Sequence, residues 1–87
     1  MNRATVLATA ATLIRGDREK THGDARLVYG LTADLWSAYL GVTLSARDVT
    51  QCLSLMKKAR TKYGQHNDDD YIDDVGYVAL ASEVGDG

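Results

Sequence analysis

A run of aspartates near the C-terminal end of the sequence carries the side chains best suited to chemistry. Five of the twelve acidic residues fall within the seven positions 68–74. If a helix is capped just before this run, Asp70, Asp73 and Asp74 project from one side of its first two turns. Mg²⁺ prefers carboxylate oxygens and is commonly held by one or two of them together with nucleotide phosphates. The spacing therefore predicts a metal site at these three residues, with Mg²⁺ as the cofactor and Mn²⁺ as the alternative.

The same aspartates also fit a purely structural interpretation. Acidic side chains in a first helical turn are favoured by the helix dipole and need no ligand. His66, just before the run, has no second His or Cys at a metal-binding interval, which favours a loop residue or a helix-terminus partner.

Basic residues precede the acidic run by a short interval. Lys57, Lys58, Arg60 and Lys62 lie near the end of an expected helix, where positive charge complements the helix dipole. Lys57 and Arg60 are three residues apart and share a face that can lie beside the acidic run. These two residues are therefore candidate phosphate ligands, because a basic pair beside an acidic metal cluster is typical of a nucleotide-phosphate site.

A polar stretch at positions 16–24 is the second place where side chains suit ligand contact. Arg18 and Lys20 are candidate phosphate contacts, and His22 is a candidate ligand contact whose imidazole is of the type that can titrate near neutral pH. Asp24 either caps the following helix or completes a metal site. An ordinary solvated loop explains the same composition.

Hydrophobic spacing and stop signals place these residues on an all-α scaffold. Apolar residues recur at intervals of three and four, interrupted by Gly16, Gly41, Gly64 and Gly85. The pattern predicts a compact bundle of four helices at about 3–15, 24–40, 45–63 and 69–83, with antiparallel neighbours in an up-and-down bundle or two helical hairpins. Seven residues on these apolar stripes are expected to be buried: Leu13, Leu31, Leu35, Leu53, Met56, Val75 and Leu80.

The aromatic residues and the cysteine are expected mainly to serve packing. Trp36 and Tyr39 fit an apolar stripe and are core or interface candidates, although a nucleobase could stack on one of them. Tyr71 and Tyr77 are candidates for a subunit interface. Cys52 is expected to be a buried structural residue, because a free cysteine behaves as a small hydrophobic side chain. It is the single cysteine in the sequence and cannot form an internal disulfide, which favours a protein of a reducing cytosol.

Length and charge exclude several classes of protein. With 87 residues, no proline and 45% hydrophobic residues, the sequence predicts one helical domain over residues 1–87. A domain this small buries little surface, which favours a homo-oligomer. A net charge of −2 argues against duplex nucleic acid or an anionic membrane as a partner. The apolar segment 4–14 is too short to span a bilayer.

Four blocks of the sequence resemble successive blocks of a small helical domain of unknown function that is frequent in tailed phages and prophages. The blocks are Arg18 to Asp24, Leu35 to Gly41, Asp48 to Arg60 and Asp70 to Tyr77. The resemblance covers nearly the whole chain. His22 stands where the family pattern has a tyrosine. This likeness implies a phage protein acting in the cytoplasm of an infected cell.

That helical layout is similar in turn to the MazG-like all-α nucleotide pyrophosphohydrolases. Those enzymes hold Mg²⁺ with a Glu-x-x-Glu motif on one helix and a Glu-x-x-Asp motif on a later one. Asp70 and Asp73 match the spacing of the later motif, whereas the second and third expected helices contain no Glu-x-x-Glu.

Two functions are compatible with these residues and with the resemblance. The first is a phage accessory protein of nucleotide metabolism with a nucleotide-phosphate and divalent-metal site, whose enzymatic activity stays uncertain. The alternative is a non-catalytic oligomer that sequesters a nucleotide signal or engages a host protein.

Overall fold

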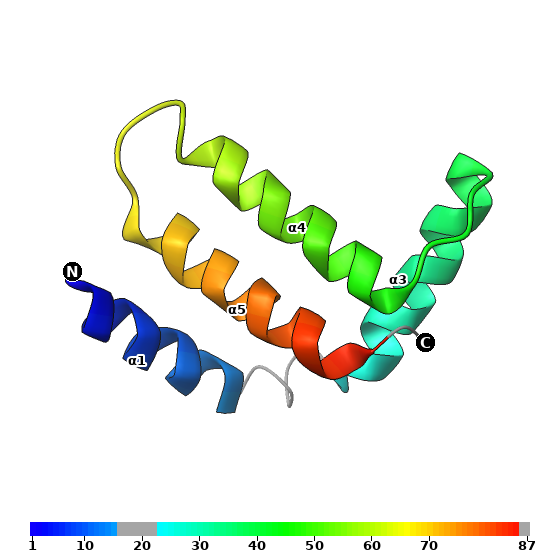
Figure 1. Ribbon diagram of the computed structural model, residues 1–87, viewed down its shortest axis with the longest axis horizontal. Coiled ribbons are helices and arrows are strands. Elements are labelled where there is room, and N and C mark those ends of the chain that lie inside the picture. Colours follow the sequence, from blue (N-terminus) through cyan, green and yellow to red (C-terminus); the bar gives the residue numbers. More distant parts are fainter. Residues whose placement is uncertain (16–22, 86–87) are drawn as a thin grey trace.

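The computed structural model describes residues 1–15 and 23–85, and Arg18, Lys20 and His22 lie outside this part of the chain. Its elements are four helices without a strand among the described residues, which confirms the all-α bundle (Figure 1). The helices are α1 (Arg3–Arg15), α3 (Ala25–Leu40), α4 (Ala46–Arg60) and α5 (Asp68–Val84). None of these helices is both long and apolar enough to cross a membrane.

Local hydrogen bonds explain where the helices begin. Asp24, Ser45 and Asn67 each accept a hydrogen bond from a backbone amide two or three residues later, which satisfies a donor that the first turn leaves unpaired. At Ser45 the bond is reciprocal, because Asp48 accepts from the Ser45 amide at 3.0 Å. Gly41 closes α3 with φ +73°, a left-handed conformation that glycine adopts without strain.

The predicted helix bounds are close to the observed ones. The third helix ends at Arg60, three residues before Tyr63, and the fourth extends by one residue at each end of the expected 69–83. The α3–α4 connection is short and is held by Ser37, whose hydroxyl accepts a hydrogen bond from the Leu44 amide at 2.8 Å.

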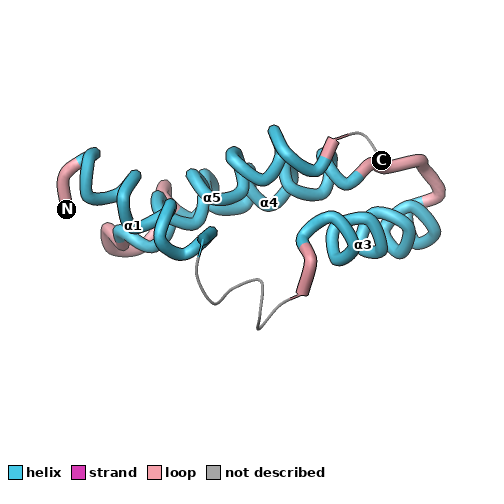
Figure 2. Tube along the Cα trace, turned by 90° about the horizontal axis from the view of Figure 1, so that it is seen from below, coloured by secondary structure: helices cyan, strands magenta, loops and turns pink. Residues whose placement is uncertain are grey.

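The centre of the molecule is an antiparallel hairpin formed by α4 and α5. Helix α1 packs along α5 only, and α3 packs mainly on α4, near the start of α4 and the end of α5 (Figures 1 and 2). Helix α1 runs in the same direction as α5, so these two helices are parallel neighbours rather than the expected antiparallel ones.

The core is built from small side chains. Among the described residues the buried apolar side chains larger than alanine are Val49, Ile72 and Val84. The other buried apolar residues are Ala10, Ala33, Ala46 and Ala81, accompanied by the polar Thr50 and Ser54. Small residues allow helices to approach closely, but they leave little apolar area to remove from water.

Several burial predictions were therefore wrong. Leu13, Leu31, Leu35 and Met56 are exposed, while Leu53, Val75 and Leu80 are only partly buried. Cys52 is exposed as well, rather than buried. The spacing identified apolar stripes correctly, but α1 and α3 each have a neighbouring helix on one side only, so part of each stripe faces outward.

Replacing Val49 with alanine should destabilise the fold by roughly 2 kcal/mol, since a fully buried side chain loses two carbons and leaves a cavity. The same change at the exposed Val42 should alter the free energy of unfolding by less than about 0.5 kcal/mol. Urea unfolding at one fixed protein concentration measures the change in the free energy of unfolding for both variants. Equal effects of the two variants would contradict this description of the core.

Candidate functional site

The three predicted metal-ligating aspartates of α5 all face the basic end of α4. Lys57 Nζ lies 2.9 Å from Asp73 Oδ2, and Lys58 Nζ lies 2.9 Å from Asp74 Oδ2. The Lys57 and Asp73 side chains are 12% and 24% exposed, so this pair is partly shielded from water. We call the pairs Lys57–Asp73, Lys58–Asp74 and Arg60–Asp70 the ion-pair ladder.

Asp74 belongs to a three-membered polar network. Ser54 donates a hydrogen bond from Oγ to Asp74 Oδ1, and Lys58 Nζ donates to Ser54 Oγ at 2.8 Å and to both Asp74 oxygens. Ser54 and Lys58 are four residues apart and therefore lie on one side of α4. Both Asp74 oxygens are thus engaged by groups of α4.

The Arg60–Asp70 pair differs from the other two pairs of the ion-pair ladder, because it borders an open groove. Arg60 Nε lies 3.5 Å from Asp70 Oδ1, which is longer than a strong charge-assisted hydrogen bond. The Asp70 side chain is 9% exposed, whereas that of Arg60 is 59% exposed. The groove has a volume of about 430 Å³ and is lined by Met56, Ala59, Arg60, Tyr63, Gly64, Gln65, Asn67 and Asp70.

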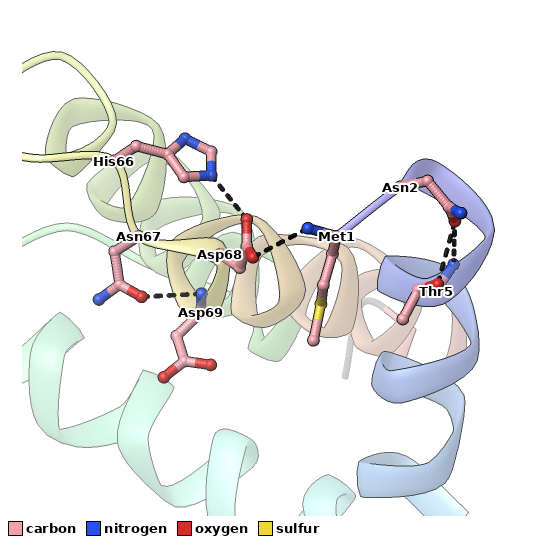
Figure 3. Close-up of polar contacts among 7 residues, drawn as sticks. All are labelled: Met1, Asn2, Thr5, His66, Asn67, Asp68 and Asp69. Atoms are coloured by element: carbon pink, nitrogen blue, oxygen red, sulfur yellow. Dashed lines mark hydrogen bonds and ion pairs between the residues drawn. The ribbon is translucent and has the colours of Figure 1, made fainter.

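A second set of contacts surrounds the start of α5 (Figure 3). Asp68 accepts from the Met1 amino group at 3.3 Å, and its other carboxylate oxygen lies 2.6 Å from His66 Nε2. These contacts, first the hydrogen bond with His66 and then that with the terminal amino group, lower the pKa of Asp68. The His66 ring also stacks on Tyr71, with ring centroids 5.5 Å apart. His66 is therefore a helix-terminus partner, one of the two roles expected from the sequence.

The donor set at α5 does not converge on one point as a chelating metal site would. Asp73 and Asp74 each contact a lysine ammonium, so binding a cation there requires the loss of an ion pair. Within residues 1–15 and 23–85, no three His, Cys, Asp or Glu side chains are grouped so that they could hold a metal ion. Asp70 is the carboxylate that combines a longer ion-pair contact with a position on the groove. The predicted Mg²⁺ or Mn²⁺ site stays a prediction.

Sequence reasoning placed the acidic and basic residues on adjacent helices but missed their partners. Ser54 was not a candidate, although its position one turn before Lys58 could have suggested a shared acceptor. The groove residues Tyr63, Gln65 and Asn67 were also missed as a group, because they come together only through the bend between α4 and α5. Tyr39, a core or interface candidate, is 89% exposed on α3.

The comparisons with known proteins identify relatives in phages. The profile of a family described as "Domain of unknown function (DUF6378)" matches residues 5–85. The chain is 32% identical over 81 residues to the Gene 55 protein of Mycobacterium phage L5, an alignment that covers 92% of this chain and 52% of that protein. The Gene 55 protein of Mycobacterium phage D29 is 34% identical over 80 residues, covering 92% and 53% of the two chains.

The chain spans about half the length of these curated relatives. No solved structure shows significant similarity to it. The expected resemblance to a phage domain of unknown function is confirmed by the family match and by both relatives. Since the family profile covers nearly all of the sequence, this helical chain belongs to the DUF6378 family, with relatives among phage proteins.

Proposed function

We propose that this chain is a phage accessory protein that binds a nucleotide or nucleotide-derived ligand in the groove between α4 and α5, and holds it without hydrolysing it. Its place of action is the cytoplasm of an infected host cell. The observation that carries the proposal is the Arg60–Asp70 pair, which borders the groove and is joined by one 3.5 Å contact.

Arg60 supplies the contact for a phosphate group. Its guanidinium is planar, permanently charged and suited to bidentate phosphate binding, and its side chain is largely exposed beside the groove. A phosphate can reach Arg60 from the solvent, because the Arg60 side chain is largely exposed even though its partner Asp70 is buried. Lys57, the other predicted phosphate ligand, is less available, since it is shielded and paired with Asp73.

The remaining groove residues suit the base of a nucleotide. Met56, Ala59 and Tyr63 give apolar and aromatic surface, while Gln65 and Asn67 add amide side chains. Stacking of a base on an aromatic ring contributes about 1–3 kcal/mol and tolerates different bases. Asn67 also caps α5, so its carboxamide oxygen is already hydrogen-bonded to the Asp69 amide at 3.0 Å. Tyr63 is therefore the principal candidate for base contact.

Binding is favoured over hydrolysis by the state of the carboxylates. Hydrolysis of the kind expected from a MazG-like layout would need several acidic groups that hold Mg²⁺ against phosphates, but Asp73 and Asp74 contact lysines of α4. The expected Glu-x-x-Glu pair is missing from α3 and α4. Of the three aspartates, Asp70 lines the groove, so we expect it to contact any cation that arrives with the nucleotide. Sequestering a nucleotide signal requires only such a binding groove.

A panel of nucleotides tested by thermal shift should reveal a stabilising ligand, because a molecule that binds only the folded form raises its apparent stability. Arg60→Gln should weaken binding of that ligand by about tenfold or more, equivalent to about 1.4 kcal/mol, since a charged phosphate contact is lost.

Lys62→Gln is the matched control, because it removes one positive charge only two residues after Arg60, at a position outside the groove lining. The Lys62→Gln variant should bind the stabilising nucleotide nearly as tightly as the unaltered protein does. If no nucleotide shifts the melting temperature, or if both variants lose binding equally, the groove is not a nucleotide site.

The contribution of Mg²⁺ is tested separately at Asp70. Calorimetric titration with the stabilising nucleotide should show tighter binding with Mg²⁺ than without it, and Asp70→Asn should remove this difference, since a neutral amide is a poorer ligand for a hard cation. Asp69→Asn, an exposed neighbour in the same turn, should retain it. Nucleotide binding unaffected by Mg²⁺ in the unaltered protein would rule out the metal and leave the phosphate contact of Arg60 intact.

A further inference from the structure

Helix α3 presents a continuous apolar stripe on the side that faces away from α4. Four of its five residues recur at intervals of four, the fifth lies three residues before the second of these, and all five are exposed. The stripe consists of Leu27, Val28, Leu31, Leu35 and Tyr39. The opposite side of α3 carries Ala33, which is buried, and Trp36, which is partly buried. In Figure 2, α3 lies on one side of the layer formed by α1, α4 and α5, and no other described helix covers its outer side.

The area that the chain leaves exposed is large for its size. Its accessible surface is 6183 Å², whereas a compact monomer of 9.5 kDa exposes about 5,000 Å². The excess over the whole chain, roughly 1,200 Å², exceeds the ~800 Å² that each partner buries in an interface of standard size. The radius of gyration, 13.7 Å, is likewise above the ~12 Å expected of a compact domain of this length. One further copy of the same chain is therefore sufficient to compensate for the small core.

The stripe is also self-complementary. Leu27 and Leu35 lie at equal intervals on either side of Leu31, so a two-fold axis near Leu31 places Leu27 against Leu35 of the partner subunit. Asp34 and Thr32 lie toward the two flanks of the stripe, which leaves its centre free of charge. We propose that the α3 stripe is the interface of an antiparallel homodimer.

Asp24 determines the antiparallel orientation. This N-cap residue precedes Leu27 and Val28 by one turn and lies on the same side of the helix. A parallel pair would bring two Asp24 carboxylates together at one end of the interface, where like charges repel. An antiparallel pair moves them to opposite ends. This inference concerns α3 alone and does not depend on ligand binding in the groove.

Light scattering and sedimentation should give the unaltered protein a mass of about twice 9.5 kDa at micromolar concentration. Leu31→Lys should give a monomer, because a charge is placed at the centre of the interface. Leu7→Lys on α1 is the matched control, since Leu7 is 57% exposed and Leu31 is 60% exposed. This control should remain dimeric. A monomer mass for the unaltered protein would overturn the proposal and point to a different partner for the stripe.

Cysteine cross-linking tests the interface without a destabilising charge. In a Cys52→Ser background, Leu31→Cys should form an intermolecular disulfide under mild oxidation, because this position faces its own copy across the axis. Leu27→Cys should not, since the two Leu27 positions are about 12 Å apart along the antiparallel helices. Cross-linking of Leu27→Cys but not of Leu31→Cys, or of neither variant, would overturn the antiparallel α3 dimer.

Discussion

The close antiparallel contact between α4 and α5 is the interaction on which the other parts of the molecule depend. Both helices contribute small or branched buried residues, among them Ala46, Val49 and Ser54 of α4 and Ile72 and Ala81 of α5. Among the described helices, α1 and α3 do not touch each other, and each rests on this hairpin. Loss of the hairpin would therefore remove the support of α1 and α3 together, as well as the groove at its bend.

Charge pairing sets the register of this hairpin more than it sets its stability. Fully exposed ion pairs contribute only about 0.2–1 kcal/mol each, and the gain from shielded pairs such as Lys57–Asp73 is offset by the cost of removing their charges from water. A slip by one helical turn would nevertheless separate Lys57 from Asp73 and Lys58 from Asp74, and a slip toward the end of α5 would bring uncharged residues opposite both lysines. At the other end of the hairpin, Arg47 Nε donates to the Ala81 carbonyl at 3.1 Å, which fixes the last turns of α5. The acidic run thus has a structural role in addition to its place at a favourable helix terminus.

The sequence predicted the helices well because their ends depend on local chemistry. The reciprocal bonds between Ser45 and Asp48 and the left-handed Gly41 involve residues close together in the chain, so their signals are visible without tertiary structure. Burial was predicted poorly because periodicity identifies an apolar side of a helix but not what covers it. Leu31 and Leu35 satisfy the helical period and still face outward, since α3 has a neighbouring helix only on its other side.

The candidate site was only partly predictable, because spacing shows which side of a helix a residue lies on but not which residue lies opposite it. Types and spacing brought Asp70 and Asp73 to one side of α5 and Lys57 and Arg60 to one side of α4, but they gave no pairing between the helices. That pairing depends on the register of the hairpin, which makes Lys57 the partner of Asp73 and leaves Arg60 at the groove. The segment 16–22, with Arg18, Lys20 and His22, lies outside the described residues.

The two proposed surfaces lie at opposite ends of the hairpin, which constrains how they can influence each other. The groove is at the bend between α4 and α5, whereas α3 rests near the start of α4 and the end of α5 (Figure 1). A dimer formed through α3 therefore leaves both grooves open and contributes no partner residue to either. Coupling between the grooves would have to pass through both hairpins, whose close-packed small residues and ion pairs resist sliding. The arrangement consequently favours two independent binding sites, a stoichiometry of one ligand per chain, and binding without cooperativity.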